Sequence, residues 1–322
     1  MAASALLRVR RDDPDYRAMA AAEAAFWENA HPFGLEETQK QFRDGFFERC
    51  VNQRFTGDPR THWTETISRW GTFRRGLVLG TSSLLWEARI LETNPGLHLL
   101  FVDISPGAVQ RRATVLGERF PGRVETATMD LNFADLPAET YDLVVSSSAI
   151  HHVTNLEHLA FQVNRTLTPS GRFFLEDYVG EARFQFTEPK KRLFEAVYRR
   201  DLARQKGRRF GIRWLDESDL SPFCALRSHE ILPALRSELD EVQLRTTATL
   251  SGLIVRMRTT EDMPIPPYWK IRLARIRKRL GLQRADVLGK RFLEELFLVG
   301  DLATEAGIAL PGLAFAIYRK RP

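Results

Sequence analysis

Residues 74–103 decide the fold, and they read RRGLVLGTSSLLWEARILETNPGLHLLFVD. An apolar strand at 77–79 leads through a tight turn into a helix over about 84–92. A break rich in turn formers follows, and then a second apolar strand at 97–102 that Asp103 closes. A strand, turn, helix and strand with an acid at the end form the opening half of a nucleotide-binding α/β fold.

The same alternation of short apolar strands and helices continues to about residue 180. Further strands are expected at 124–128, 141–147 and 172–178, and helices from Ser105 and over 155–167, with a turn at 169–171. Later in the chain we expect a strand near 242–247, a helix at 292–300 and a strand at 313–318. The pattern predicts an α/β fold with a doubly wound, mostly parallel seven-stranded sheet that a late antiparallel strand completes.

Four regions follow from this pattern. They are a helical, aromatic-rich N-terminal cap at 1–70, a cofactor-binding α/β core at 71–180, lid and substrate insertions at 181–290 that include a core strand near 242–247, and a C-terminal helix and strand at 291–322.

Composition favours an ordered, reduced protein. Hydrophobic residues make up 43% of the chain, which permits a sizeable core. The formal charge of +6 permits an acidic partner but does not require one. The two cysteines, Cys50 and Cys224, lie in no metal-like or redox-like spacing, and no apolar stretch is long enough to span a membrane. We therefore expect a cytoplasmic protein.

Two acids mark the carboxyl ends of strands, where ligands bind in such sheets. Asp103 is expected to accept hydrogen bonds from ribose hydroxyls, with capping of the next helix as the alternative. Asp130 follows the strand at 124–128 and is expected to accept from an adenine amino group, with a solvated loop acid as the alternative.

The pair His151 and His152 follows the strand at 141–147 and is a candidate general base, because histidine titrates near neutral pH. Asp177 closes the next strand and is expected to orient a histidine or bind substrate. Adjacent histidines do not easily chelate one metal, and no cysteine or acid cluster joins them in the sequence. No metal site is expected.

The order of these motifs resembles the class I S-adenosylmethionine-dependent methyltransferases over about residues 75–180. The motifs are VLG at 78–80, FVDISP at 101–106, Asp130, YDLVVS at 141–146, the histidine pair, and LTPSGRFF at 167–174, where the family normally has Leu-Lys-Pro-Gly-Gly.

The resemblance implies S-adenosylmethionine as the cofactor and a small molecule as the acceptor. It places the turn of Gly80, Thr81 and Ser82 against the methionine part, Asp103 on ribose, and Ile104 beside the adenine. It places Asp130 and Leu131 on the adenine and Ser147 at the cofactor edge. It also implies that His151, His152 and Asp177 lie where small-molecule O-methyltransferases, including those that act on sugars of natural products, carry a base.

The family turn usually reads Gly-x-Gly-x-Gly, whereas Ser82 and Leu84 stand at the later glycine places here. Three hypotheses remain: an O-directed small-molecule methyltransferase, a catalytically inactive methyltransferase-like partner or scaffold subunit, and a nucleic-acid methyltransferase. The third lacks a base-flipping signature.

A basic helix at 270–280 allows weak contact with a membrane surface, although a solvated surface helix is the preferred interpretation.

Overall fold

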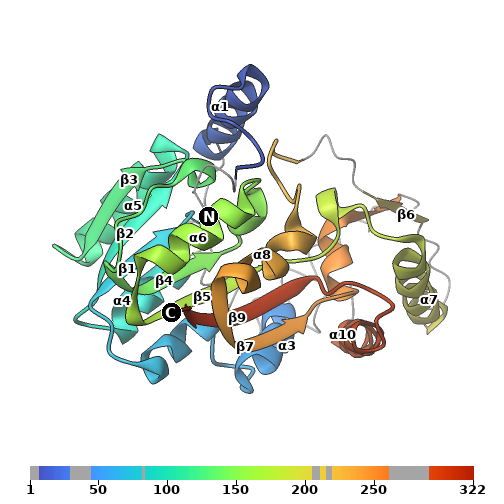
Figure 1. Cartoon of the computed structure of the whole chain (residues 1–322). Helices are drawn as coiled ribbons and strands as arrows, with labels where there is room; N and C mark the ends of the chain where they lie inside the picture. Colours follow the sequence, from blue (N-terminus) through green and yellow to red (C-terminus); the bar gives the residue numbers. More distant parts are fainter. Residues whose placement is uncertain (1–6, 30–44, 82–83, 205–210, 215–219, 261–289) are drawn as a thin grey trace, which may run out of the picture. The chain divides into compact units, whose positions relative to one another are not determined.

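The computed structural model describes residues 7–29, 45–81, 84–204, 211–214, 220–260 and 290–322 (Figure 1). The chain divides into two compact units. Unit 1 comprises residues 1–185, 220–247 and 310–322, and unit 2 comprises residues 186–219 and 248–309. The predicted helix at 270–280 lies outside the described residues.

Unit 1 is built on a seven-stranded sheet in the order β3-β2-β1-β4-β5-β9-β7. The strands are β1 Arg75–Leu79, β2 His98–Asp103, β3 Val124–Thr128, β4 Tyr141–Ser147, β5 Leu167–Tyr178, β7 Leu239–Thr247 and β9 Leu313–Lys320. The first five pair in parallel, and β9 runs antiparallel between β5 and β7. The predicted fold class, including the inserted antiparallel strand, is confirmed.

The two faces of the sheet carry separate apolar clusters, because neighbouring side chains of a strand point to opposite faces. Leu77 and Leu79 of β1 pack in one cluster with α6 and α8, while Val78 packs in the other with α3, η2, α4 and α5. These helices are α3 Phe46–Thr56, η2 Trp63–Trp70, α4 Leu84–Thr93, α5 Pro106–Arg119, α6 Leu156–Thr166 and α8 Ile231–Glu238. Helices on both faces of a parallel sheet make unit 1 a three-layer α/β structure.

Local sequence sets where α5 begins. The Ser105 side chain accepts a hydrogen bond from the Ala108 N–H (3.2 Å), and Pro106 occupies the first helical turn. This is the predicted start, since serine caps helices and proline suits their first position.

One local prediction is wrong. The turn expected at 169–171 lies within β5, which begins at Leu167. Pairing with β4 moves from Tyr141–Leu167 to Leu143–Arg172, so the extra residues are accommodated as an irregularity of the strand instead of a turn.

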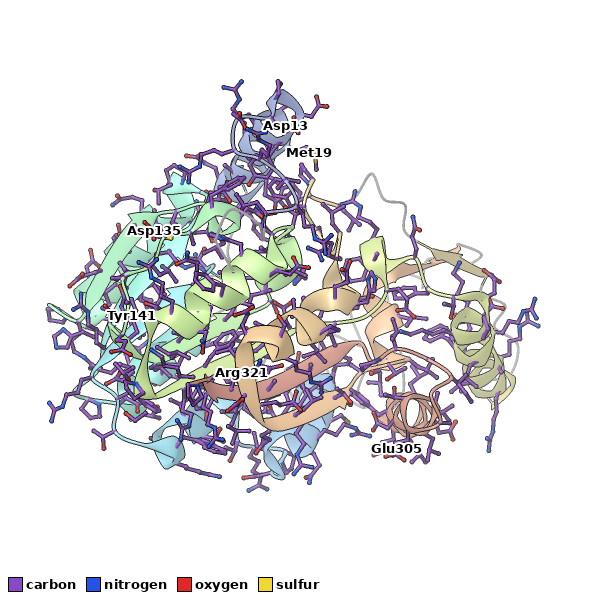
Figure 2. The ribbon with its side chains drawn as sticks, viewed as in Figure 1. Asp13, Met19, Asp135, Tyr141, Glu305 and Arg321 are labelled. Carbon is purple, nitrogen blue, oxygen red and sulfur yellow. The ribbon has the colours of Figure 1, made fainter. Side chains whose placement is uncertain are left out.

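Shorter elements complete unit 1. They are α1 Pro14–Asn29, η3 Leu131–Phe133, η4 Ile150–His152, η5 Ala182–Phe184 and η7 Ser228–Glu230. Arg321, labelled in Figure 2, follows β9. It donates to the Asp240 carboxylate (3.2 Å) and to the carbonyls of Arg236, Ser237 and Leu239. These contacts fix the end of the inserted strand against the segment that leads into β7.

Unit 2 contains α7 Glu188–Arg204, η8 Ser251–Arg256, α10 Lys290–Glu305 and a two-stranded antiparallel sheet of β6 Gly211–Trp214 and β8 Met257–Thr260. Thr249 and Thr304 share a hydrogen bond of 2.6 Å between their hydroxyls. In the part of the chain that the structure describes, none of the helices has the length and apolar character needed to span a membrane.

Candidate active site

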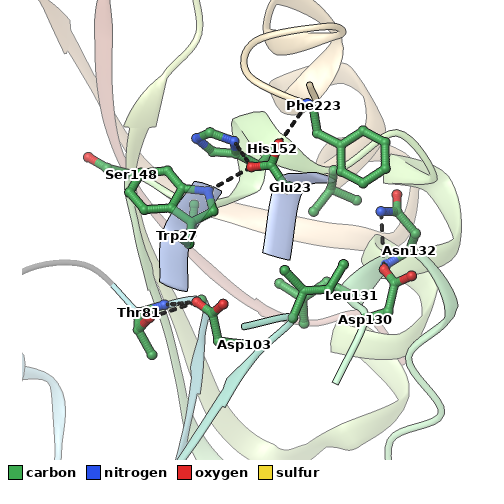
Figure 3. A pocket seen from close by; sticks show the side chains of 14 residues that line it. Glu23, Trp27, Thr81, Asp103, Asp130, Leu131, Asn132, Ser148, His152 and Phe223 are labelled. Carbon is green, nitrogen blue, oxygen red and sulfur yellow. Dashed lines mark hydrogen bonds and ion pairs between the residues drawn. The ribbon is translucent and has the colours of Figure 1, made fainter. Parts of the chain in front are cut away.

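A pocket opens at the carboxyl edge of the sheet in unit 1, where ligands bind in such folds (Figure 3). Its empty volume is about 520 Å³, part of which is open to solvent. It is lined by Glu23, Trp27, Gly80, Thr81, Asp103, Ile104, Asp130, Leu131, Asn132, Ser148, Ala149, His152, Val153 and Phe223.

The turn after β1 needs glycine at position 80 for two reasons. Gly80 has φ +74°, a conformation that side chains disfavour, and a Cβ there would lie 2.3 Å from the Cβ of Ala149. The turn therefore packs directly against the segment that follows β4. Thr81 lines the pocket, and Ser82 lies outside the described residues.

Asp103 is held by the turn it faces. Its Oδ2 accepts from the backbone N–H and hydroxyl of Thr81 (2.8 and 2.7 Å), and its Oδ1 accepts from the Ser105 N–H (2.9 Å). A carboxylate offers about four acceptor positions. Asp103 thus has room for about one further donor from a ligand in the pocket.

Asp130 caps the short helix η3 and binds a residue of the N-terminal helix. Its Oδ1 accepts from the Asn132 N–H (3.0 Å), and its Oδ2 accepts from the Tyr16 hydroxyl (2.6 Å). Burial and the Asp130 carboxylate raise the pKa of Tyr16, so this phenol stays protonated and keeps donating. Ile104 and Leu131 supply apolar pocket wall beside these acids.

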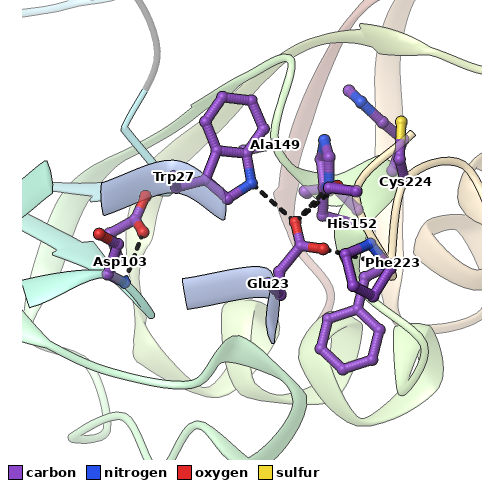
Figure 4. A network of polar contacts seen from close by, with 12 residues as sticks. Glu23, Trp27, Asp103, Ala149, His152, Phe223 and Cys224 are labelled. Carbon is purple, nitrogen blue, oxygen red and sulfur yellow. Dashed lines mark hydrogen bonds and ion pairs between the residues drawn. The ribbon is translucent and has the colours of Figure 1, made fainter. Parts of the chain in front are cut away.

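His152 lines the pocket and is fixed by a buried carboxylate from α1. Its Nδ1 lies 2.9 Å from Oε1 of Glu23, whose residue is 1% exposed. Glu23 also accepts from Trp27 Nε1 (2.7 Å), the Ser221 hydroxyl (2.9 Å) and the Phe223 N–H (2.8 Å), and Figure 4 shows its carboxylate between Trp27 and His152.

The electrostatics of this pair favour a neutral imidazole beside an ionised acid. Burial lowers the pKa of His152, and the neighbouring His151 lowers it further. Burial acts to raise the pKa of Glu23, but its contacts with His152 and with the donor groups outweigh that effect and the pKa is lowered. A neutral imidazole with one nitrogen held by a carboxylate is suited to accept a proton.

Asp177 organises the turn that carries the histidines. Its Oδ1 lies 2.5 Å from Nδ1 of His151, and its Oδ2 accepts from the N–H groups of Ala149, Ile150 and His151 (3.2, 2.7 and 3.3 Å). Burial acts to lower the pKa of His151, but the Asp177 carboxylate overcomes it and raises the pKa to about 10. Asp177 thus contacts both the ring of His151 and the backbone of the turn that carries the histidines.

Comparisons with known proteins find a family match in the part of the chain that contains several pocket residues. The family model described as "Methyltransferase domain" matches residues 77–173. These residues contain Gly80, Asp103, Asp130 and His152, which line the pocket. The chain contains a class I S-adenosylmethionine-dependent methyltransferase domain.

Two relatives show how far this similarity extends. The ubiquinone/menaquinone biosynthesis C-methyltransferase UbiE of Geobacter sulfurreducens is 28% identical over 134 residues, which are 40% of this chain and 48% of that protein. The match thus spans about half of that relative's length. The geranyl diphosphate C-methyltransferase of Streptomyces coelicolor A3(2) is 12% identical and superposes with a TM-score of 0.51 over 97% of this chain and 100% of its own. At this identity the likeness concerns the fold.

Ser147 of this methyltransferase domain is buried and is not among the residues that line the pocket. Its hydroxyl donates to Oε2 of Glu176 (2.9 Å), and the residue is 7% exposed. The next residue, Ser148, lines the pocket instead. Burial and the adjacent Asp177 charge raise the pKa of Glu176 to about 7.

The structure brings a cysteine to the two histidines, although none lies near them in the sequence. One ligand atom each from His151, His152 and Cys224 lie within 4.8 Å of one another. The N–H of Ala225 donates to the carbonyl of His151 (2.8 Å), which brings the loop of Cys224 to the histidine turn. No local pattern in the sequence indicates this, because Cys224 lies 72 positions after His152.

The pocket also contains residues that were not predicted from the sequence. Glu23 and Trp27 line the pocket from α1, and Tyr16 binds Asp130 from the same helix. Tyr16, Glu23 and Trp27 are spaced by seven and four residues, which places all three on one face of the helix. This spacing is visible in the sequence. Phe223, which stacks on Tyr16 (ring centroids 5.5 Å apart), carried no such signal.

Proposed function

We propose that this methyltransferase domain transfers a methyl group from S-adenosylmethionine to a hydroxyl of a small molecule, such as a sugar or another natural product. The observation that carries the proposal is that one pocket contains both the acid at the end of β2, Asp103, and the histidine held by a buried acid, His152 with Glu23. Figure 3 shows Asp103 and Leu131 on one side of the pocket and Trp27 and His152 on another.

The residues on the Asp103 side fit the cofactor. Asp103 keeps room for about one donor such as a ribose hydroxyl, after the three it accepts from Thr81 and Ser105. Ile104 and Leu131 offer apolar wall for an adenine ring, and Asp130 lies beside them. When bound, S-adenosylmethionine supplies an electrophilic methyl group.

The residues on the His152 side fit an acceptor that must lose a proton. Since Nδ1 of His152 faces Glu23, Nε2 remains to accept the proton of a hydroxyl. Glu23 then stabilises the imidazolium that forms and keeps the ring oriented. Trp27 and Phe223 offer aromatic surface for the acceptor, and holding the two reactants in line supplies most of the rate enhancement.

The test is methyl transfer from radiolabelled S-adenosylmethionine to a panel of hydroxylated small molecules and, in parallel, to carbon acceptors, since the UbiE relative is named a C-methyltransferase. His152→Ala is expected to lower turnover by about 10²- to 10⁴-fold with cofactor affinity retained. His98→Ala, which removes an exposed histidine at the start of β2, is the matched control. Full activity of His152→Ala contradicts the base assignment, and transfer to carbon alone contradicts the hydroxyl assignment.

We also propose a cytoplasmic location, which the absence of a disulfide at Cys50 and Cys224 supports. If the chain binds no methyl donor at all, the inactive partner or scaffold becomes the better hypothesis.

A further inference from the structure

We propose that His151, His152 and Cys224 form a binding site for a divalent transition metal of the zinc type. Their ligand atoms lie within 4.8 Å of one another, and the centroids of the two imidazole rings are 4.2 Å apart. Zinc–ligand bonds of about 2.0 Å to nitrogen and 2.3 Å to sulfur place tetrahedral ligand atoms roughly 3.3–3.6 Å apart. The three side chains therefore need to contract by about 1 Å to enclose the ion.

Each histidine already has the partner that metal-bound histidines use. Nδ1 of His151 lies 2.5 Å from Asp177, and Nδ1 of His152 lies 2.9 Å from Glu23. A carboxylate on one imidazole nitrogen fixes the ring and makes the other nitrogen a stronger ligand. Both carboxylates are buried, with 0% and 1% exposure for Asp177 and Glu23, and both accept backbone N–H groups that hold them in place.

Three hydrogen bonds also hold the loop that carries Cys224. The Ala225 N–H donates to the His151 carbonyl (2.8 Å), the Cys224 N–H donates to the Ser221 carbonyl (3.1 Å), and the Arg183 guanidinium donates to the Cys224 carbonyl (3.2 Å). Cys224 is 7% exposed. The thiol is thus positioned before any ion binds, so little ordering of the chain opposes binding.

The types of ligand atom and the charges around them favour zinc. Two imidazoles and a thiolate suit zinc, and three protein ligands leave a fourth position open. With Cys224 ionised, the thiolate and the carboxylates of Asp177 and Glu23 place three negative charges around two histidines. His152 lines the pocket, so the open position is accessible to water or to a ligand atom in the pocket.

The site has a consequence for the reaction. A metal ion on Nε2 of His152 and a proton taken from an acceptor use the same nitrogen, so each excludes the other. The inference goes beyond the proposed function, and its test uses neither methyl donor nor acceptor. Failure of the metal site therefore leaves the proposed transfer intact, and failure of transfer leaves the metal site intact.

The test is a titration of the full chain, after treatment with a chelator, with Co²⁺ as a spectroscopic substitute for zinc. We expect one equivalent to give the visible absorption of a tetrahedral cobalt site and a near-ultraviolet thiolate-to-cobalt band, and we expect Zn²⁺ to displace it. Cys224→Ser should lose the thiolate band, whereas Cys50→Ser, the matched control, should keep it. No band in the unmodified chain, or the same band in Cys224→Ser, overturns the proposal.

A second variant guards against a folding defect in Cys224→Ser. Glu23→Gln keeps the volume of the side chain but removes the charge behind His152. Loss of such a partner is expected to weaken Zn²⁺ binding by about 10- to 100-fold, measured by competition with a chromophoric chelator. Glu28→Gln, on the exposed face of the same helix, is its control. Equal Zn²⁺ affinity in these two variants, each with native circular dichroism, overturns the proposal.

Discussion

Replacing Glu23 by alanine removes one of the groups that attach α1 to the pocket, beside Tyr16, which binds Asp130. The carboxylate binds His152 Nδ1 (2.9 Å), Trp27 Nε1 (2.7 Å), the Ser221 hydroxyl (2.9 Å) and the Phe223 N–H (2.8 Å). Because His152 is neutral, the change leaves neutral donors without their acceptor; each buried donor left unpaired costs about 1–3 kcal/mol, and we take about 3–5 kcal/mol for the group of donors together. At about 1.4 kcal/mol per factor of ten, this corresponds to a change of about 100- to 4,000-fold in the equilibrium for opening of α1.

Hydrogen exchange of peptides that cover α1 measures this opening directly. We expect exchange in Glu23→Ala to accelerate by that factor within residues 14–29, and protection within β4 to change much less. Glu28→Ala is the matched control, because Glu28 is an exposed residue of the same helix whose backbone carbonyl, not its side chain, accepts from Arg111. Equal protection of α1 in the two variants would refute the reasoning.

Three further predictions concern the turn after β1, the pH dependence of stability and the binding of the cofactor. Gly80→Ala should lower the melting temperature more than Gly57→Ala. Both glycines have positive φ (+74° and +83°), but only at Gly80 would a new Cβ clash with a neighbour, which costs about 1–3 kcal/mol. Equal losses of melting temperature contradict this. Arg227 lowers the pKa of Glu157 to about 2, so the stability that this pair contributes is present above the unfolded pKa of about 4.3 and is lost as the pH falls toward 2. Glu157→Gln should therefore be less stable at pH 6 but lose less stability on acidification, as measured by urea unfolding at each pH, and parallel curves contradict the assignment. Asp103→Ala should weaken S-adenosylhomocysteine binding by about tenfold or more in calorimetry, the contribution of a hydrogen bond to a charged group, and unchanged affinity contradicts its role.

The sheet could be predicted from the sequence because each strand carries its own signal. β1 and β4 are apolar runs of the length that strands buried on both faces require, and Ser105 with Pro106 marks the start of α5. The late antiparallel strand β9 was also predicted, from its apolar run and the helix before it. The turn at 169–171 was not predicted correctly, because proline and glycine also occur where a strand is irregular.

The candidate site could be predicted only where its residues follow the strands. Asp103 ends β2, Asp130 and His152 follow β3 and β4, and parallel strands bring their carboxyl ends to one edge. Glu23 belongs to a helix far away in the chain, and its role depends on a tertiary contact with His152 that no local pattern encodes. Cys224 was missed for the same reason.

Binding of the methyl donor tests the central claim most directly, since every proposed role of Asp103, His152 and Glu23 in methyl transfer depends on it. Calorimetric titration of the full chain with S-adenosylmethionine and S-adenosylhomocysteine is expected to give one site per chain with a dissociation constant in the micromolar range. It should weaken in Asp103→Ala and persist in His152→Ala. Heat indistinguishable from dilution at millimolar ligand would contradict the account and would favour a methyltransferase-like chain that acts as a partner or scaffold.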